Sequence, residues 1–302
     1  MRPTARRWAS VTLGLALLGL LLPHQAHAFC RLSTGMPMPG PVGGCNVSGV
    51  PLTWDSQCLT YSVVGRERDT PAFDDEDAFD IRDAIDSSFA TWAEVECGGG
   101  QLPVEVRQTV PLSKCDDPEH NSDGLNSNSI AFVENWEDRG LPPEAYGVTL
   151  VWHDPNSGEI VDADMQLNET AGTIDFCESS CSGDGVDLQN VVTHEVGHFL
   201  GLGHSDEVNA SMYGESTRGE IRKAFLNDDD VEGICSIYAG LEEPGCKSAD
   251  FAPRNGWSPA CGAGEDGCSV GRVGRHSDRS SIPFALFLLA ILGGAYRRRA
   301  RC

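Results

Sequence analysis

Three histidines stand at a spacing that suits a metal ion. His194 and His198 are four positions apart, so on a helix both imidazoles project from one face, one turn apart. That spacing lets both rings bind one zinc ion at about 2.0–2.1 Å. Gly201 allows the chain to leave the helix with a positive φ and to bring His204 round as a third ligand. Three neutral nitrogen ligands leave a fourth position open for water, which is typical of a catalytic zinc site.

Glu195 directly follows the first of these histidines and is the predicted catalytic residue. Its carboxylate can reach a water molecule on the metal without being a ligand itself, so we predict that it is the general base. The water would attack a peptide carbonyl that zinc polarises, and Glu195 would deliver the proton to the leaving amine. The alternatives are three unrelated histidines or an intact zinc site without turnover. The presence of Glu195 argues against a site without turnover, because decay of activity would remove the base first.

The stretch from His194 to Ser205 resembles the metzincin metalloproteases and, within them, the matrixins. Ser205 follows the third histidine as in matrixins, and Met212 stands at the matrixin interval in a segment similar to their Met-turn. Residues 226–234 are similar to the start of the matrixin C-terminal helix, and the specific likeness covers residues 187–238. The resemblance implies an α+β fold with a mixed, twisted β-sheet, an active-site helix and a C-terminal helix. It also implies one catalytic Zn²⁺ held by the three histidines, with Met212 as an apolar floor beneath them.

The same resemblance implies how a substrate would bind. Residues 161–168 have the character of the family's edge strand, to which a peptide could add as a further strand. Residues 214–225 would wall the pocket for the residue after the scissile bond. Two features of vertebrate matrixins are not evident, namely a cysteine-switch propeptide and a second, structural zinc. For that zinc the histidines outside the motif and outside residues 1–28, which are His120, His153 and His276, are too scattered.

Hydrophobic periodicity predicts the elements that must position these residues. Helical spacing over residues 72–96, with acids in the first turn, predicts a helix that Gly98–Gly100 end. The active-site helix is expected over 187–200 and a last helix, capped by its first acids, over 227–240. Residues 161–168 alternate, which predicts a half-buried strand with Asp162 and its like-facing neighbours on a polar outer face. Further strands are expected at 59–64, 104–107, 130–133 and 148–152.

Several loop residues carry oxygen donors of the kind that calcium binds. The family resemblance also suggests calcium, but no spacing is that of an EF-hand, so solvated turn acids are the favoured interpretation. Asp187 is equally suited to cap the active-site helix. The candidate donors are Asp154, Asn156, Asp162, Asp164, Asp184 and Asp187.

The two ends of the chain differ in composition from the body. Residues 1–28 combine arginines, a short apolar run and Ala26-His27-Ala28, as in a secretory signal cleaved after Ala28; a membrane anchor is the alternative, for which the run is short. Residues 282–302 join an apolar run to an arginine cluster. Together with Gly267-Cys268-Ser269 before them, they resemble the tripartite C-terminal sorting tails of myxobacterial surface proteins, and an ordinary weak tail anchor is the alternative. Between the ends we expect an irregular Cys/Gly/Pro segment at 29–51, a protease domain at 52–240 and a Cys/Gly/Ser-rich linker at 241–281.

Composition bounds the function. The chain has 302 residues, a formal net charge of −23 and 12 cysteines. The part of the chain between its two ends is strongly negative and would repel phosphate groups, which argues against nucleic-acid binding. The cysteines indicate an oxidising compartment and disulfides of unreadable connectivity, with metal binding by Cys177 and Cys181 as the alternative.

The sequence therefore predicts a secreted or envelope-tethered bacterial zinc endopeptidase that acts on proteins or peptides through a zinc-bound water. A narrower form of this prediction is a processing protease for neighbouring surface proteins. The alternative is a catalytically inactive zinc-containing adhesion or binding module at the cell surface.

Overall fold

The computed structural model describes residues 28–35, 45, 48–64, 77–109, 117–177, 179–242, 244–253 and 256–258. The predicted tail at 282–302 lies outside these residues, as do the predicted signal segment up to His27 and the linker beyond Ser258. Within the described ranges, no helix combines the length and the apolarity needed to cross a bilayer.

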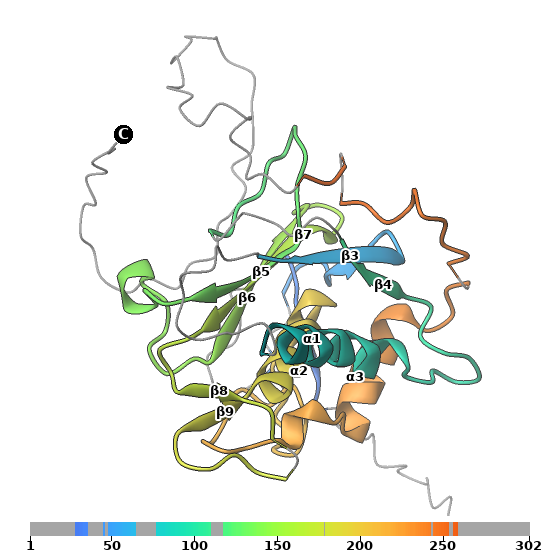
Figure 1. Cartoon of the computed structure of the whole chain (residues 1–302). Coiled ribbons are helices and arrows are strands. Elements are labelled where there is room, and N and C mark those ends of the chain that lie inside the picture. The colour runs from blue at the N-terminus through green and yellow to red at the C-terminus, as the bar shows by residue number, and fades with distance from the viewer. Residues whose placement is uncertain are drawn as a thin grey trace, which may run out of the picture.

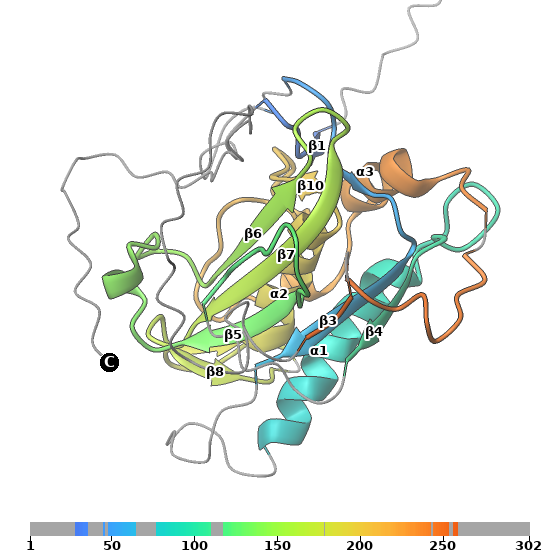
Figure 2. The ribbon, with the colours of Figure 1, turned by 90° about the horizontal axis from the view of Figure 1, so that it is seen from above.

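A mixed six-stranded sheet forms one layer, and helices α1 and α2 pack side by side against one of its faces (Figures 1 and 2). This arrangement confirms the predicted α+β class. Five strands run parallel in the order β2, β7, β5, β3, β4, and β6 pairs antiparallel with β7. Their bounds are Thr53–Trp54 (β2), Cys58–Val63 (β3), Glu105–Gln108 (β4), Ser129–Val133 (β5), Gly147–His153 (β6) and Glu159–Asn168 (β7). The strands expected from the sequence are confirmed within one or two residues.

The prediction that residues 161–168 form an edge strand is wrong. β7 pairs with β5 along one side, from Ile130 opposite Met165 onward, and with β6 along the other side. Among the described residues β6 pairs with β7 alone, so β6, like β4 at the far side of the sheet, is an edge strand. Alternation in a sequence reports two faces of a strand and does not report its place in the sheet.

The predicted polar outer face of β7 is also buried rather than solvated. Asp162, Asp164 and Gln166 are at most 2 % exposed, and residues 119 and 120 lie against the first two. The backbone N–H of Glu119 donates to Oδ2 of Asp164 at 2.9 Å, and Nδ1 of His120 lies 3.0 Å from Oδ2 of Asp162.

In the described part of the chain, three α-helices surround the core. α1 (Asp77–Ala93) packs on α2 (Leu188–Phe199), and the indole N–H of Trp92 donates to the carbonyl oxygen of Thr193 at 2.8 Å. α1 ends at Ala93 and not at the three glycines, which instead turn the chain between the bridged residues Glu96 and Gln101. α3 (Asp228–Tyr238) starts at an Asn227 cap, and of the acids expected to cap it, Asp230 completes a capping box with Asn227. The short elements are β1 (Cys30–Arg31), η1 (Glu137–Arg139), β8 (Thr173–Asp175), β9 (Gly185–Asp187), β10 (Leu202–Gly203) and η2 (Arg222–Ala224).

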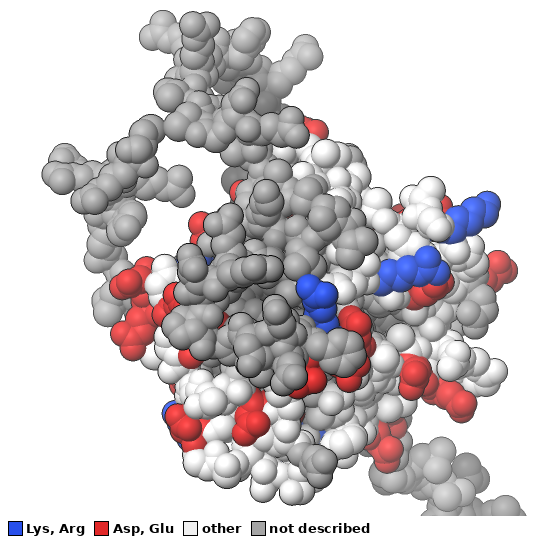
Figure 3. Space-filling view, in the orientation of Figure 1, with Lys and Arg blue, Asp and Glu red and all other residues white. Residues whose placement is uncertain are grey.

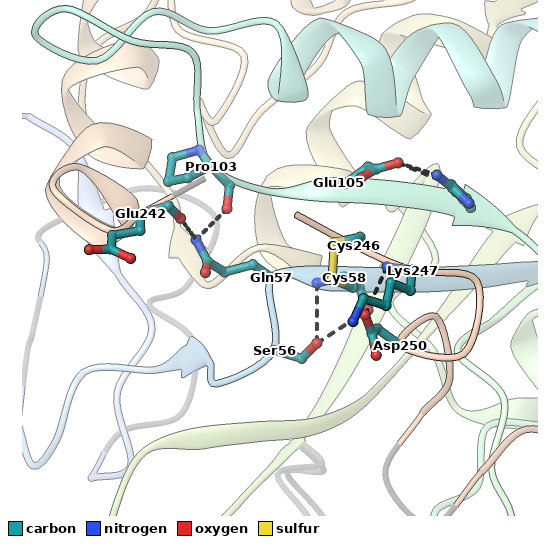
Figure 4. Close-up of a disulfide and its surroundings, with 10 residues drawn as sticks. Ser56, Gln57, Cys58, Pro103, Glu105, Glu242, Cys246, Lys247 and Asp250 are labelled. Carbon is teal, nitrogen blue, oxygen red and sulfur yellow. Dashed lines mark hydrogen bonds and ion pairs between the residues drawn. A yellow bond between two sulfur atoms is a disulfide. The ribbon is translucent and has the colours of Figure 1, made fainter. Parts of the chain in front are cut away.

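Disulfides join distant parts of the described chain. Cys58–Cys246 ties the segment after α3 to the start of β3, where the side-chain amide of Gln57 donates to the carbonyl oxygens of Pro103 and Glu242 (Figure 4). The close pair Cys177 and Cys181 forms a disulfide, which excludes the alternative of a thiolate metal site there. Two further bonds between described residues are Cys30–Cys45 and Cys97–Cys235. Figure 3 shows many acidic and few basic side chains spread over the face of the molecule that it presents.

Candidate metal centre

α2 carries the first two predicted ligands and is held at both ends. The Asp187 carboxylate accepts a hydrogen bond from the backbone N–H of Asn190 at 2.7 Å, so it caps the helix as predicted. Gly201, with φ of 100°, turns the chain just past the helix. A side chain at Gly197 would begin 2.1 Å from Sδ of Met212, so glycine is required for the Met-turn to approach the helix. The helix is thereby fixed against the segment that follows the third histidine.

The three imidazoles converge. One ring nitrogen from each of His194, His198 and His204 lies within 4.8 Å of the others, a spacing that allows one ion to contact all three. The ring centroids are 4.9 Å apart for His194 and His198, 5.2 Å for His194 and His204, and 4.9 Å for His198 and His204. His198 is 1 % exposed and His194 is 9 % exposed. The predicted ligand trio is therefore assembled from α2 and the turn after β10.

The backbone orients the first two rings. Nδ1 of His194 lies 2.6 Å from the carbonyl oxygen of Ser211, and Nδ1 of His198 lies 2.8 Å from that of Leu202. A carbonyl can only accept, so each Nδ1 carries the proton and each Nε2 keeps a free lone pair. Burial is the largest cause that lowers the pKa of both rings, to about 3 for His198. Neutral imidazoles with oriented lone pairs are the form that binds zinc, so this donor set fits the metal.

Glu195 lies against the edge strand. Its carboxylate accepts a hydrogen bond from the Thr149 hydroxyl at 2.7 Å. A side chain at Gly147 would begin 2.9 Å from Oε1 of Glu195, so β6 packs tightly behind the carboxylate. Burial raises the Glu195 pKa to about 7, while the Thr149 hydrogen bond and the charge of Lys223 act in the opposite direction. The sequence predicted this strand but not its contact with Glu195, because the two are far apart in the chain.

The Met-turn rests on α3. Met212 is 1 % exposed, and its backbone N–H and that of Ser211 donate to the two carboxylate oxygens of Asp230 at 2.9 and 2.7 Å. Ser211 in turn offers its carbonyl oxygen to His194. Asp230 therefore links the C-terminal helix to a ligand through one residue of the turn, a role that the sequence did not reveal.

The side chains considered as calcium donors make hydrogen bonds within the protein at separate places. One Asp154 oxygen accepts the backbone N–H groups of Asn156 and Ser157 within its turn, and Asp187 is the α2 cap. Asp162 and Asp164 belong to the buried cluster behind β7. The Thr173 hydroxyl donates to Asp184 at 3.3 Å. In the described part of the chain, none of these residues belongs to a group of three or more His, Cys, Asp or Glu side chains close enough to share an ion.

Comparison with known proteins gives a consistent result. The family model described as Matrixin matches residues 53–239. Metalloendoproteinase 1-MMP of Arabidopsis thaliana is 29 % identical over 186 residues, which are 61 % of this chain and 44 % of that protein. Human Matrilysin is 26 % identical over 225 residues, 74 % of this chain and 72 % of its own. Metalloendoproteinase 4-MMP of Arabidopsis thaliana is 46 % identical over 160 residues, 53 % of this chain and 40 % of its own. The chain thus spans less than half the length of the two plant relatives.

Proposed function

Because the chain belongs to the matrixin family, we propose that it is a zinc-dependent endopeptidase that hydrolyses peptide bonds in proteins or peptides. The observation that carries this proposal is the convergence of three imidazoles, two of them kept neutral by burial, beside a buried carboxylate. We assign His194, His198 and His204 as the zinc ligands and Glu195 as the general base. When bound, zinc supplies electrophilic catalysis, since it polarises a carbonyl oxygen and lowers the pKa of water.

The residues of the chain have distinct parts in this reaction. Glu195 takes a proton from the attacking water and returns it to the leaving amine. Its pKa of about 7 suits both transfers near neutral pH. Thr149 holds the Glu195 carboxylate in one orientation through the 2.7 Å hydrogen bond. β6 lies at an edge of the sheet beside Glu195, whereas residues 161–168 lie inside the sheet. An extended substrate would therefore add to β6 by main-chain hydrogen bonds.

An inactive zinc-containing binding module would need the three histidines but not the base. The contacts of Glu195 with Thr149 and Gly147 give its carboxylate a defined place that metal binding alone does not require. These contacts favour the enzyme.

The test is Glu195→Gln, which keeps the shape of the side chain and removes the base. The purified variant should bind one zinc ion, as the wild type does, and should lose hydrolysis of a quenched peptide mixture by about 10²–10⁴-fold. Glu94→Gln, at an exposed position in the turn directly after α1, is the matched control and should keep full activity. Wild-type-like turnover by Glu195→Gln would refute the assignment of the base, and a wild type without zinc-dependent hydrolysis would refute the enzyme.

We also propose that the protein is secreted after cleavage behind Ala28. The disulfides suit an oxidising compartment. The backbone N–H of Phe29 donates to Oδ1 of Asp229 at 2.9 Å, and Oδ2 of Asp229 accepts the Ser205 hydroxyl. Cleavage would turn the Phe29 nitrogen into an ammonium group and strengthen this bond by adding charge. N-terminal sequencing of the exported protein should begin at Phe29; an exported protein that keeps residues 1–28 would contradict the proposal.

Tethering to a bacterial envelope by residues 282–302 remains part of the proposal on the strength of the sorting-tail resemblance alone. Calcium binding remains part of it as a family property. Retention of the full-length protein in the envelope fraction, and its release when residues 282–302 are deleted, would support the tether.

A further inference from the structure

A lysine lies buried next to the metal centre. Lys223 is 2 % exposed and belongs to η2, within the segment 214–225 expected to wall the substrate pocket. Its ammonium group donates to the carbonyl oxygen of Tyr213. Among the residues that the structure describes, no carboxylate oxygen lies within 4.0 Å of this ammonium. Lysines are almost never fully buried unless they are paired, so this one has an unusual position.

The backbone of Lys223 is fixed between the metal-binding helix and the Met-turn. Its N–H donates to Oδ1 of Asn190 at 2.7 Å, and its carbonyl oxygen accepts the Ser211 hydroxyl. Asn190 lies one turn before His194 on α2, and Ser211 binds the ring of His194. The Lys223 side chain then runs to Tyr213, the residue after the Met-turn methionine. The ammonium therefore lies between the helix that carries the ligands and the start of the expected wall.

The charge of Lys223 acts on the reacting groups. It contributes to the lowered pKa of His194 and opposes the effect of burial on the pKa of Glu195. Burial lowers the pKa of Lys223 itself to about 8, with Glu220, Glu195 and Asp230 acting against that shift and Arg222 with it. The side chain therefore stays mostly protonated at neutral pH. An ammonium has three donors and the backbone of Tyr213 takes one, so two are left for a ligand.

We propose that Lys223 selects substrates with an acidic side chain directly after the scissile bond. The inference rests on the proposed peptidase function and adds the substrate class to it. A glutamate at that position supplies the carboxylate that the buried ammonium lacks, and the resulting charge-assisted hydrogen bond forms away from water. An amide or apolar side chain leaves the charge unpaired, which a buried polar site penalises. Lys223 is thus a specificity-determining residue.

The experiment compares two quenched peptides that differ only by glutamate or glutamine after the cleaved bond. For the zinc-loaded wild type we expect kcat/KM to favour the glutamate peptide by about tenfold or more. Lys223→Met keeps the length of the stem and removes the charge, so the ratio should fall to about one. Lys223→Arg, a second variant that restores the charge, should recover a preference for glutamate. Lys247→Met is the matched control, because this exposed lysine lies on the segment bound to β3 (Figure 4), and it should keep the wild-type ratio.

Two results would overturn the inference while leaving the peptidase intact, namely a wild-type ratio near one or an unchanged ratio in Lys223→Met. The second would show that Lys223 only supports the backbone at Tyr213. Binding of both peptides to the Glu195→Gln variant, measured by calorimetry, gives the same comparison without turnover, and equal affinities would also overturn it. If the wild type cleaves neither these peptides nor any in the quenched mixture, the proposed function fails instead.

Discussion

Two clusters of buried polar side chains lie on opposite faces of β7. On the helix side, the metal-centre cluster brings together three imidazoles. On the other side, the β7 cluster consists of Asp162, Asp164, His120 and the Ser129 groups bound to them. Both contain histidine and both are shielded from water, yet their hydrogen bonds differ. The difference shows which kind of buried polarity indicates a ligand site.

In the β7 cluster donors from the protein saturate the carboxylate of Asp164, whereas Oδ1 of Asp162 is buried with no hydrogen-bond partner among the described residues. Asp164 accepts three hydrogen bonds, two from the N–H and hydroxyl of Ser129 and one from Glu119, and Asp162 is next to His120. In the metal-centre cluster the protein binds only the outer nitrogens of His194 and His198 and leaves the inner ones directed at one point. Donors that saturate a buried group indicate a structural role, whereas converging lone pairs indicate a site that can bind a cation.

Replacing one histidine in each cluster by alanine should give the largest difference in zinc binding and activity between the two clusters. His198→Ala removes one of three ligands, so we expect loss of the bound zinc and a fall in kcat/KM of more than about a thousandfold. His120→Ala should keep one zinc ion and should change kcat/KM by no more than about twofold. Elemental analysis and peptide kinetics measure both. Loss of zinc from His120→Ala at an unchanged fold would mean that the two clusters are not functionally separate.

Thr149 tests whether the edge strand positions the base. Thr149→Val removes the hydroxyl that binds Glu195 and keeps the branched shape, so we expect kcat to fall about 10–100-fold with little change in KM. Thr149→Ser restores the hydroxyl and should recover most of the rate. A valine variant with the wild-type kcat would show that Glu195 needs no support from β6. A parallel loss of stability in both variants would instead indicate a packing effect.

Asp164 tests the structural cluster. Asp164→Ala leaves three donors without an acceptor in the sheet, so the free energy of unfolding should fall by about 3 kcal/mol. Urea unfolding of the chelator-treated protein measures this change. Asp123→Ala, at an exposed loop position nearby, is the control and should change stability by no more than about 0.5 kcal/mol. While it remains folded, the Asp164 variant should bind zinc as the wild type does; a selective loss of zinc would contradict the separation of the two faces.

The convergence of the three imidazoles could be predicted from the sequence because the information for it is local. The four-residue interval of His194 and His198, the turn at Gly201 and the nearby Met212 all lie within a short stretch of chain. Helical geometry converts such an interval into proximity without any knowledge of the tertiary fold. The parallel and antiparallel strands were found for a similar reason, since alternation of apolar residues is also a local property.

The contacts that sequence reasoning missed are all long-range. Thr149 meets Glu195 across 46 positions, and Glu119 meets Asp164 across 45. Whether β7 is central, and what covers its polar face, depends on which strands pair with it and on the path of residues 117–128. Alternation of polar and apolar residues predicts that a strand has one polar face. It does not say whether water or a covering loop makes the hydrogen bonds to that face.

The smallest expected effect concerns pH and the β7 cluster. Burial raises the pKa of Asp162 and of Asp164, and the Asp162 charge raises the latter further. A carboxyl group whose pKa is raised on folding binds its proton more tightly in the folded state, so it favours folding at pH values below its ordinary pKa near 4. This contribution is lost as the pH rises through the raised pKa. Asp162→Asn removes one titrating group and its charge. The free energy of unfolding of the wild type, minus that of Asp162→Asn, should therefore decrease from about pH 4 upward, with a slope of at most about 1.4 kcal/mol per pH unit for each proton.

Urea titrations at a series of pH values, with chelator present so that zinc loss does not contribute, measure that difference. Asp123→Asn serves as the control, because an exposed carboxyl should give a difference that is flat with pH. A difference that rises with pH would mean that His120 holds Asp162 as a stable ion pair in spite of its burial. In that case the β7 cluster would contain a buried salt bridge between Asp162 and His120. The two clusters would then differ because the β7 cluster pairs opposite charges, whereas the metal centre keeps its imidazoles neutral.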